Sequence, residues 1–265
     1  AVLSYKQFQG LASAAATPEY KNSNYNTAYG YFKLKEYDEA ARFFQLQIDN
    51  TKEDKLRLND SYLRMADCSF VTSKYTTALE AYNKVIELKS VDADYAYFQK
   101  ALCYGFVSKN DKKIQELNTF LQLYPKSEYR DDAFFELGNT YVAQNNQDLA
   151  IKTYDKLNVE FKNGSFTSKA ILKQGLVYYN ADKDEQALTK FKKVAADFPN
   201  TPEALEAVST ARLIYVDKGR VDEYANWVRT LNLVAVTDAE LDNDTYEAAE
   251  KQCCQISKRN PFLES

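Results

Sequence analysis

Residues 124–157 read YPKSEYRDDAFFELGNTYVAQNNQDLAIKTYDKL, and residues 170–194, AILKQGLVYYNADKDEQALTKFKKV, repeat the same pattern of small and aromatic residues 37 positions later. Within each stretch the apolar residues recur at steps of three and four, which is typical of a helix with one buried face. A polar stretch separates two such helices in each copy. The sequence therefore predicts a unit of two antiparallel helices that recurs along the chain.

A small residue marks the first helix of each unit. When the segments are aligned on the glycine of ELGNTY, five of them have a small residue at this position: Ala28, Ala66, Ala101, Gly138 and Gly175, at intervals of 38, 35, 37 and 37. An aromatic residue follows three positions later in four of the five, namely Tyr31, Tyr104, Tyr141 and Tyr178, and Ser69 is the exception. Because a small side chain lets two helix backbones approach, we expect each small residue at a helix–helix contact.

The second helix of each unit has its own pattern. A small residue occurs at Ala40, Ala78, Ala150 and Ala187, where the third unit has Lys113 instead. Four positions later comes a large apolar residue: Phe44, Tyr82, Leu117, Tyr154 and Phe191. A unit of this length cannot bury its own apolar face, so neighbouring units must stack against each other.

This pattern is similar to the tetratricopeptide repeat (TPR), whose consensus is W-x₂-L-G-x₂-Y, then A-x₃-F, then P. The stretches FFELGNTY, AIKTY and ALTKF…FP carry the resemblance. It implies an all-α fold, a right-handed α-solenoid of antiparallel helix pairs. We predict a single TPR-like solenoid over residues 1–265. Its parts are the second helix of a truncated unit (1–20), five repeats (21–58, 59–93, 94–130, 131–167, 168–204), a degenerate repeat (205–241), and a partial unit with an irregular tail (242–265).

Composition is that of an ordinary globular protein. Of the 265 residues, 45% are hydrophobic and 27% charged, and the formal net charge is −4. The lysine clusters stand among acidic neighbours, whereas a protein that binds the phosphate backbone needs a concentrated basic surface. We therefore expect no nucleic acid among the partners.

No apolar run reaches the roughly 18 residues that a membrane-spanning helix needs. We expect no transmembrane segment in this chain. Because the chain begins at Ala1 without an initiator Met, we expect it to be part of a longer protein, whose N-terminus would carry any outer-membrane anchor. Incomplete units at both ends would leave apolar faces uncapped, so self-association is also expected.

The chain contains no histidine. This excludes Ser–His–Asp and Cys–His catalysis, His-ligated zinc, and the side chain most often used for proton transfer near neutral pH. A Gly-rich phosphate loop and a G-x-S-x-G motif are also missing from the sequence. The four cysteines lack C-x-x-C spacing. We therefore predict that the protein is not an enzyme and has no catalytic residue, cofactor or metal.

Three smaller features are interpreted structurally. Cys68 and Cys103 are expected to be buried and reduced, because stacked helices lie about 8–10 Å apart, beyond the usual reach of a disulfide. Cys253 and Cys254 are expected to be exposed in the tail, and Trp227 to pack between helices. The acidic stretches RDDAFF, DKDEQ and DAELDND are assigned to helix starts, where Asp and Glu are favoured.

The resemblance also implies a binding surface. In TPR proteins the first helices line a concave face that binds a peptide or helix of a partner. We call the positions three before, one after and four after each small residue the first-helix ladder. The predicted partner groove consists of ten ladder residues: Tyr25, Tyr29, Phe32, Leu63, Phe70, Phe98, Leu102, Phe135, Asn139 and Tyr179. Two interpretations remain open for these aromatics, namely core packing between helices and anchors for a partner.

The leading functional hypothesis is a non-enzymatic protein–protein interaction scaffold. FLQLYPKSEYRDDAFFELGNTY and VAADFPNTPEALEAV resemble the linkage between repeats in two bacterial envelope TPR proteins, the Tol–Pal-associated periplasmic coordinator and the outer-membrane assembly lipoprotein. That resemblance implies a periplasmic or outer-membrane-associated role in cell-envelope assembly or coordination. The alternative is a cytoplasmic regulatory TPR module of a larger signalling or enzyme chain. The ladder lacks the Lys and Asn pattern with which some TPR proteins grip a C-terminal carboxylate, so such a clamp is not expected.

Overall fold

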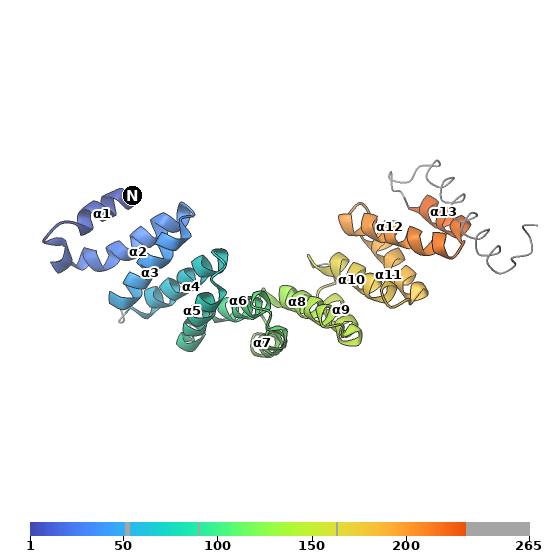
Figure 1. Ribbon diagram of the computed structural model, residues 1–265, viewed down its shortest axis with the longest axis horizontal. Helices are drawn as coiled ribbons and strands as arrows, with labels where there is room; N and C mark the ends of the chain where they lie inside the picture. Colours follow the sequence, from blue (N-terminus) through green and yellow to red (C-terminus); the bar gives the residue numbers. More distant parts are fainter. Residues whose placement is uncertain (51–53, 90, 163, 232–265) are drawn as a thin grey trace, which may run out of the picture. The chain divides into compact units, whose positions relative to one another are not determined.

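The computed structural model describes residues 1–50, 54–89, 91–162 and 164–231, and all regular structure within them is helical (Figure 1). There are thirteen α-helices in this described part, and a 3₁₀ turn at Ala14–Ala16. The helices are α1 (Val2–Gln9), α2 (Pro18–Lys33), α3 (Tyr37–Asn50), α4 (Lys55–Val71), α5 (Tyr75–Leu88), α6 (Ala93–Phe106), α7 (Asn110–Leu123), α8 (Arg130–Ala143), α9 (Gln147–Glu160), α10 (Thr167–Tyr179), α11 (Asp184–Asp197), α12 (Pro202–Asp217) and α13 (Val221–Thr230). The predicted all-α, helical-repeat fold class is confirmed. The predicted partial unit at 242–265, the acidic stretch DAELDND and the pair Cys253–Cys254 lie outside the described residues.

The chain divides into two compact units, residues 1–140 (unit 1) and 141–265 (unit 2). In unit 1 each helix from α2 to α6 packs on the next one along the chain, and α1 packs on α2. In unit 2 the same holds from α9 to α13. One helix pair lies in each segment predicted as a repeat, from α2–α3 to α12–α13. That a single solenoid runs through both units stays a prediction.

The small residues of the first helices lie where helices meet. Ala28, Ala66 and Ala101 are fully buried, and Gly138 and Gly175 are buried as well. A methyl group added at Gly175 would lie 2.5 Å from the ring of Phe191, closer than two carbon atoms can approach. The expected steric role of the small residue is therefore confirmed.

Each helix pair is joined by a tight turn with one residue in the left-handed conformation. These residues are Lys35, Ser73, Ser108, Asn145, Asp182 and Gly219, at intervals of 38, 35, 37, 37 and 37. In each turn the next residue donates its amide to the carbonyl five positions earlier, as Glu36 does to Tyr31 (3.0 Å) and Arg220 to Tyr215 (2.8 Å). This is the Schellman motif that ends many helices. The repeat is therefore conserved in backbone geometry as well as in side-chain size.

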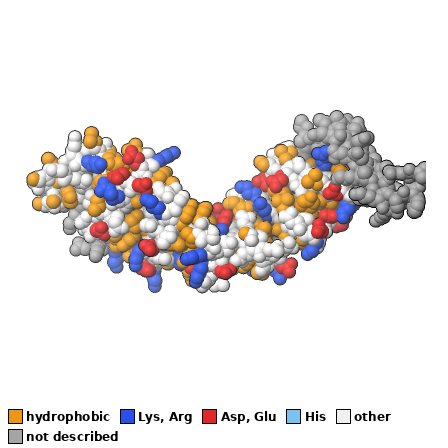
Figure 2. All heavy atoms as spheres, in the orientation of Figure 1, with side chains coloured by type: hydrophobic (Ala, Val, Ile, Leu, Met, Phe, Trp, Pro, Cys, Tyr) orange, Lys and Arg blue, Asp and Glu red, His pale blue; other side chains and the backbone are white. Residues whose placement is uncertain are grey.

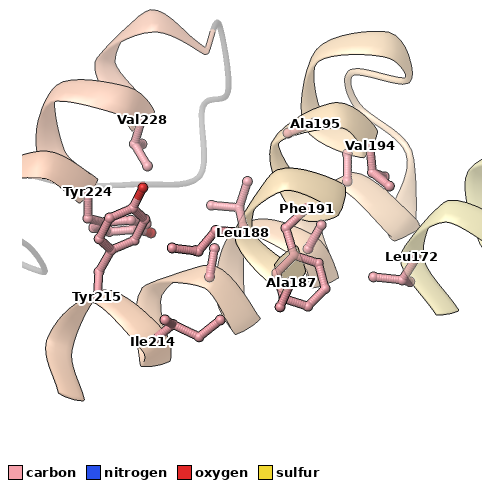
Figure 3. Close-up of a cluster of buried hydrophobic side chains, with 14 of the residues drawn as sticks. Leu172, Ala187, Leu188, Phe191, Val194, Ala195, Ile214, Tyr215, Tyr224 and Val228 are labelled. Atoms are coloured by element: carbon pink, nitrogen blue, oxygen red, sulfur yellow. The ribbon is translucent and has the colours of Figure 1, made fainter. Parts of the chain in front are cut away.

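The core of unit 2 extends into the degenerate repeat. Leu172 of α10, Phe191 of α11, and Tyr215 and Tyr224 of α12 and α13 belong to one buried cluster (Figure 3). In the degenerate repeat the aligned position is Arg212, and the neighbouring Ala211 takes the fully buried place instead. Trp227 packs against the same cluster, with ring centres 6.4 Å from Tyr215 and 6.1 Å from Tyr224. Its predicted packing role is confirmed.

Two departures from the pattern in the third repeat compensate each other. Lys113 stands where the other repeats have alanine, and Gly105 stands where the ladder has a large side chain in the first two repeats. The aliphatic part of Lys113 lies over Gly105, since a methyl group there would come within 3.0 Å of Lys113 Cδ. The ammonium group then reaches Glu136 of α8 at 2.6 Å. The glycine thus makes room for the lysine stem.

The predictions for Cys68 and Cys103 are confirmed, and those for the acidic stretches are confirmed in part. Cys68 and Cys103 are free, fully buried thiols, and burial raises the pKa of each to about 12. The two acidic residues of RDDAFF lie in the first turn of α8, and Asp184 and Glu185 of DKDEQ lie in the first turn of α11, whereas Asp182 is the left-handed residue of the turn before it.

Candidate functional site

The ladder residues predicted to face a partner are not equally exposed. Leu63 and Phe98 have only 2% and 6% of their surface exposed. Leu63 belongs to the core cluster between α4 and α5, and the ring of Phe98 stacks on Tyr129 at 5.9 Å. These two are therefore core residues, which corrects their assignment to a partner-facing surface. The reason is that the position three before the small residue faces the adjacent helix in these repeats.

The other eight predicted residues are half-buried. Seven of them lie in unit 1: Tyr25, Tyr29 and Phe32 on α2, Phe70 on α4, Leu102 on α6, and Phe135 and Asn139 on α8. Tyr179 lies on α10 in unit 2. The candidate site is therefore the ladder of unit 1, and Tyr179 is described with unit 2.

Two tyrosines of α2 share one carboxylate of α4. The hydroxyl groups of Tyr25 and Tyr29 donate to Asp60 Oδ2 at 2.8 and 2.6 Å. Their rings are in edge-to-face contact, with centres 4.9 Å apart. Tyr29 also contacts Phe44 of α3 edge-to-face at 5.3 Å, a geometry that aromatic pairs favour. Both rings are therefore held at one end by a hydrogen bond and along the ring by aromatic packing.

A second carboxylate continues the network toward α6. Arg64 forms ion pairs with Asp60 (3.4 Å) and Asp67 (2.9 Å), one turn away on either side of it along α4. Asp67 Oδ1 accepts hydrogen bonds from Tyr82 of α5 (2.9 Å) and Tyr95 of α6 (3.1 Å). We call these residues, with Tyr25 and Tyr29, the tyrosine–aspartate network. It connects the first helices of three successive repeats.

Burial raises the pKa of several groups in this network. The pKa of Tyr25 and of Tyr29 is raised, first by burial and then by the hydrogen bond to Asp60. Burial also raises the pKa of Asp67, although the hydrogen bond from Tyr82 and the charge of Arg64 oppose the shift. The phenols thus stay neutral hydrogen-bond donors, and their hydroxyl groups are occupied within the protein. A partner at this site would contact the rings rather than the hydroxyl groups.

The ladder position four after the small residue packs across the turn. Phe32 is in edge-to-face contact with Tyr37 at 5.7 Å, and Phe70 with Tyr75 at 5.6 Å. In both repeats the second ring lies five residues after the first and begins the second helix. The sequence analysis missed this pairing, although the repeated spacing of five was visible in it. It also missed the Asp60, Arg64 and Asp67 pattern, which occurs in one repeat and so could not be found by comparing repeats.

The described residues contain no group of three or more Cys, Asp and Glu side chains arranged to hold a metal ion. Among these residues, no helix combines the length and apolarity needed to cross a bilayer. Hydrophobic, basic and acidic side chains are interspersed on the face visible in Figure 2.

Residues 132–163 and 169–201 match the tetratricopeptide repeat family. The matched segments cover most of α8–α9 and α10–α11. These two helix pairs are TPR repeats, and the predicted resemblance is confirmed at that level. No curated protein sequence matches the chain.

Several solved TPR structures share the fold. MamA (residues 41 to the end) from Desulfovibrio magneticus RS-1 has a TM-score of 0.56 at 16% identity, covering 68% of this chain and 97% of its own. YrrB, described as a TPR protein with an unusual peptide-binding site, has a TM-score of 0.51 at 19% identity, covering 79% and 97%. The TPR-like repeats of a putative kinesin light chain from Podosopora anserina have a TM-score of 0.51 at 13% identity, covering 68% and 95%. At these identities the likeness shows the fold alone.

Proposed function

We propose that the chain is a non-enzymatic scaffold that binds a segment of another protein on the first helices of unit 1. TPR repeats generally serve as protein-binding modules, and the repeats at 132–163 and 169–201 support that role here. The peptide-binding site named for YrrB is further support by analogy of fold.

The observation that carries this proposal is the rigid pair Tyr25 and Tyr29. Both rings are half-buried, so part of each remains open to a partner. Asp60 holds both hydroxyl groups, and Phe44 supports both rings from α3 at 6.2 and 5.3 Å. Aromatic side chains that are ordered before binding lose little conformational entropy when a partner docks. An apolar side chain of the partner would pack on the open part of this pair.

The test begins with selection of binding peptides from a random displayed library on the immobilised chain. The affinity of a selected peptide is then measured by fluorescence anisotropy for three variants. Tyr25→Ala with Tyr29→Ala should lower affinity by about 30-fold or more, as expected for hot-spot residues. Tyr25→Phe with Tyr29→Phe keeps the rings and should lower it far less. Tyr179→Ala in unit 2 should leave it unchanged.

Two outcomes would contradict the proposal. One is equal affinity for the wild type and the Tyr25→Ala, Tyr29→Ala variant, with circular dichroism showing that both are folded. The other is a loss of affinity in the Tyr179→Ala variant equal to that in the alanine pair. Either result would place peptide binding elsewhere on the chain.

We further propose a bacterial envelope location, periplasmic or outer-membrane-associated, on the sequence resemblance of the segments around Pro125 and Pro199 to envelope TPR proteins. Fractionation of source cells with an antibody to this chain tests it. Recovery in the cytoplasmic fraction would favour the alternative, a regulatory module of a larger chain.

A further inference from the structure

One edge of unit 1 exposes large apolar side chains at the ends of three successive first helices. Leu34, Val71 and Phe106 have 60%, 57% and 57% of their surface exposed. Each stands at the turn that joins a first helix to its second helix. We call the turns 33–36, 71–74 and 106–109 the turn edge of unit 1.

One of these apolar side chains, Phe106, is held in place by its neighbours. The ring of Phe106 stacks on Tyr75 with centres 4.6 Å apart and planes 7° from parallel, and it meets Phe70 edge-to-face at 5.4 Å. Lys74 pairs with Asp38 at 2.7 Å, which ties the second turn to the start of α3. These contacts connect the turn at 71–74 to the start of α3 and to the turn at 106–109.

Lysines flank the exposed apolar residues. The turn edge contains the exposed Lys33, Lys35 and Lys109 against one exposed acidic residue, Glu36, while the charge of Lys74 is paired with Asp38. In addition, α5 and α7 follow Lys74 and Lys109 without a side-chain cap at their N-termini. Uncapped helix N-termini carry partial positive charge and unpaired amides. The turn edge thus combines exposed apolar side chains with groups that attract anions.

The corresponding turns of unit 2 lack this combination. Residues 143–146, 180–183 and 217–220 contain no apolar residue larger than alanine. Two of their three cations are paired with acids, Lys218 with Asp184 of α11 (2.7 Å) and Arg220 with Glu185 of α11 and Glu223 of α13. The repeat itself therefore does not require apolar tips or unpaired lysines at a turn.

We propose that the turn edge of unit 1 docks on the surface of a bilayer that contains anionic phospholipids. Apolar side chains flanked by lysines are typical of protein surfaces that bind at the bilayer–water interface. The apolar side chains insert among the lipids, and the ammonium groups stay at the lipid phosphates. Lysines stand beside the exposed apolar side chains at the turn edge, whereas the core of a protein–protein interface is depleted of lysine. The surface lies on other residues than Tyr25 and Tyr29, so the two proposals are independent.

Vesicle flotation with the 265-residue chain tests the proposal. The chain should float with vesicles of phosphatidylcholine and phosphatidylglycerol at low salt, and far less with phosphatidylcholine alone or at high salt. The variant Leu34→Ser, Val71→Ser, Phe106→Ser should lose at least about tenfold in partition coefficient, because the inserted apolar area is gone. The variant Lys33→Gln, Lys35→Gln, Lys109→Gln should lose about fivefold per lysine.

A matched control removes three exposed apolar side chains elsewhere. Leu56→Ser, Val91→Ser, Val159→Ser changes residues that are 74%, 84% and 73% exposed, and it should float like the wild type. Circular dichroism must show that every variant is folded. The proposal is overturned if the wild type does not float with anionic vesicles, or if the turn and control variants float equally. It is also overturned if the turn variant loses binding to a protein partner while the wild type ignores vesicles, since the edge would then be a protein-docking surface.

Discussion

Unit 1 and unit 2 use the same helix-pair pattern but connect neighbouring repeats by different polar contacts. In unit 1, two aspartates and Arg64 of α4 connect tyrosines of α2, α5 and α6. In unit 2, the fully buried Gln174 donates to the Ile151 carbonyl (3.1 Å) and Asp155 (2.7 Å), and it accepts from Lys190 (2.8 Å). The comparison shows that the repeat determines where helices pack, while the polar contacts between repeats differ from one pair to the next.

The largest expected effect comes from breaking the network of unit 1. Asp67→Ala leaves the hydroxyl groups of Tyr82 and Tyr95 without their acceptor, and Tyr82 is buried. Because unsatisfied buried donors are costly, we expect about 2–4 kcal/mol loss of unfolding free energy. Urea denaturation followed by circular dichroism measures it. Asp155→Ala in unit 2 is the control, and it should cost less than about 1 kcal/mol, because this side chain is largely exposed. Similar losses for the two variants would contradict the contrast between the units.

The next effect concerns close packing in unit 2. Gly175→Ala places a methyl group against the buried ring of Phe191. Overpacking costs about 1–3 kcal/mol, and alanine recovers up to about 1 kcal/mol of helix propensity. We expect a net loss, with a lower midpoint of thermal unfolding. In the Phe191→Leu background the ring is gone, so adding Gly175→Ala should lower the unfolding free energy by less than it does in the wild type. A stabilised Gly175→Ala protein would mean that the ring moves aside freely.

The compensating pair in the third repeat offers a double-mutant cycle. Gly105→Phe should destabilise unit 1 by about 1–3 kcal/mol, because the new ring meets the stem of Lys113. Adding Lys113→Ala restores the small residue of the other repeats and should recover most of that loss. Additive losses in the two single variants and the double variant would show that the residues are not coupled.

A smaller effect is expected at the left-handed turn residues. Ser73→Gly in unit 1 should stabilise the protein by about 0.5–1 kcal/mol, since the left-handed conformation disfavours a side chain and the added chain entropy of glycine cancels only part of the gain. Gly219→Ala in unit 2 is the reverse change, and it should destabilise by a similar amount. Chemical denaturation of both variants measures the two changes in unfolding free energy. If both changes had the same sign, the explanation would be wrong.

The smallest effect is in the pH dependence of stability, because Asp67 is one of 38 acidic residues. Its folded-state pKa is raised above the ordinary value of 3.8, chiefly by burial. The folded state therefore binds this proton more tightly than the unfolded state does. The contribution of Asp67 to stability is greatest below pH 3.8 and falls as pH rises through the folded-state pKa. The difference in unfolding free energy between the wild type and Asp67→Asn, measured from pH 3.5 to 7, should follow that direction. A difference that does not change with pH would show that Asp67 titrates alike in both states.

Much of the fold was predictable because it depends on periodic residues. The helix pairs, the burial of Ala28 to Gly175, and the buried large residues Phe44, Leu117 and Phe191 all follow from one repeated spacing. The candidate site was predictable only in part. The ladder was placed on the first helices, yet the burial of Leu63 and Phe98 depends on which neighbouring helix each side chain meets.

By itself the sequence determined that the protein is a chain of helix pairs, because a small residue and an apolar stripe at a fixed interval can be buried only by stacking such units. The tertiary structure alone decided the tyrosine–aspartate network, the fit of Lys113 over Gly105, and the contact of Phe106 with Tyr75. Each of these joins residues of different helices and depends on side chains that the other repeats do not share. A periodic pattern shows only what all repeats share. Contacts between residues that are not repeated can therefore be identified only from the folded structure.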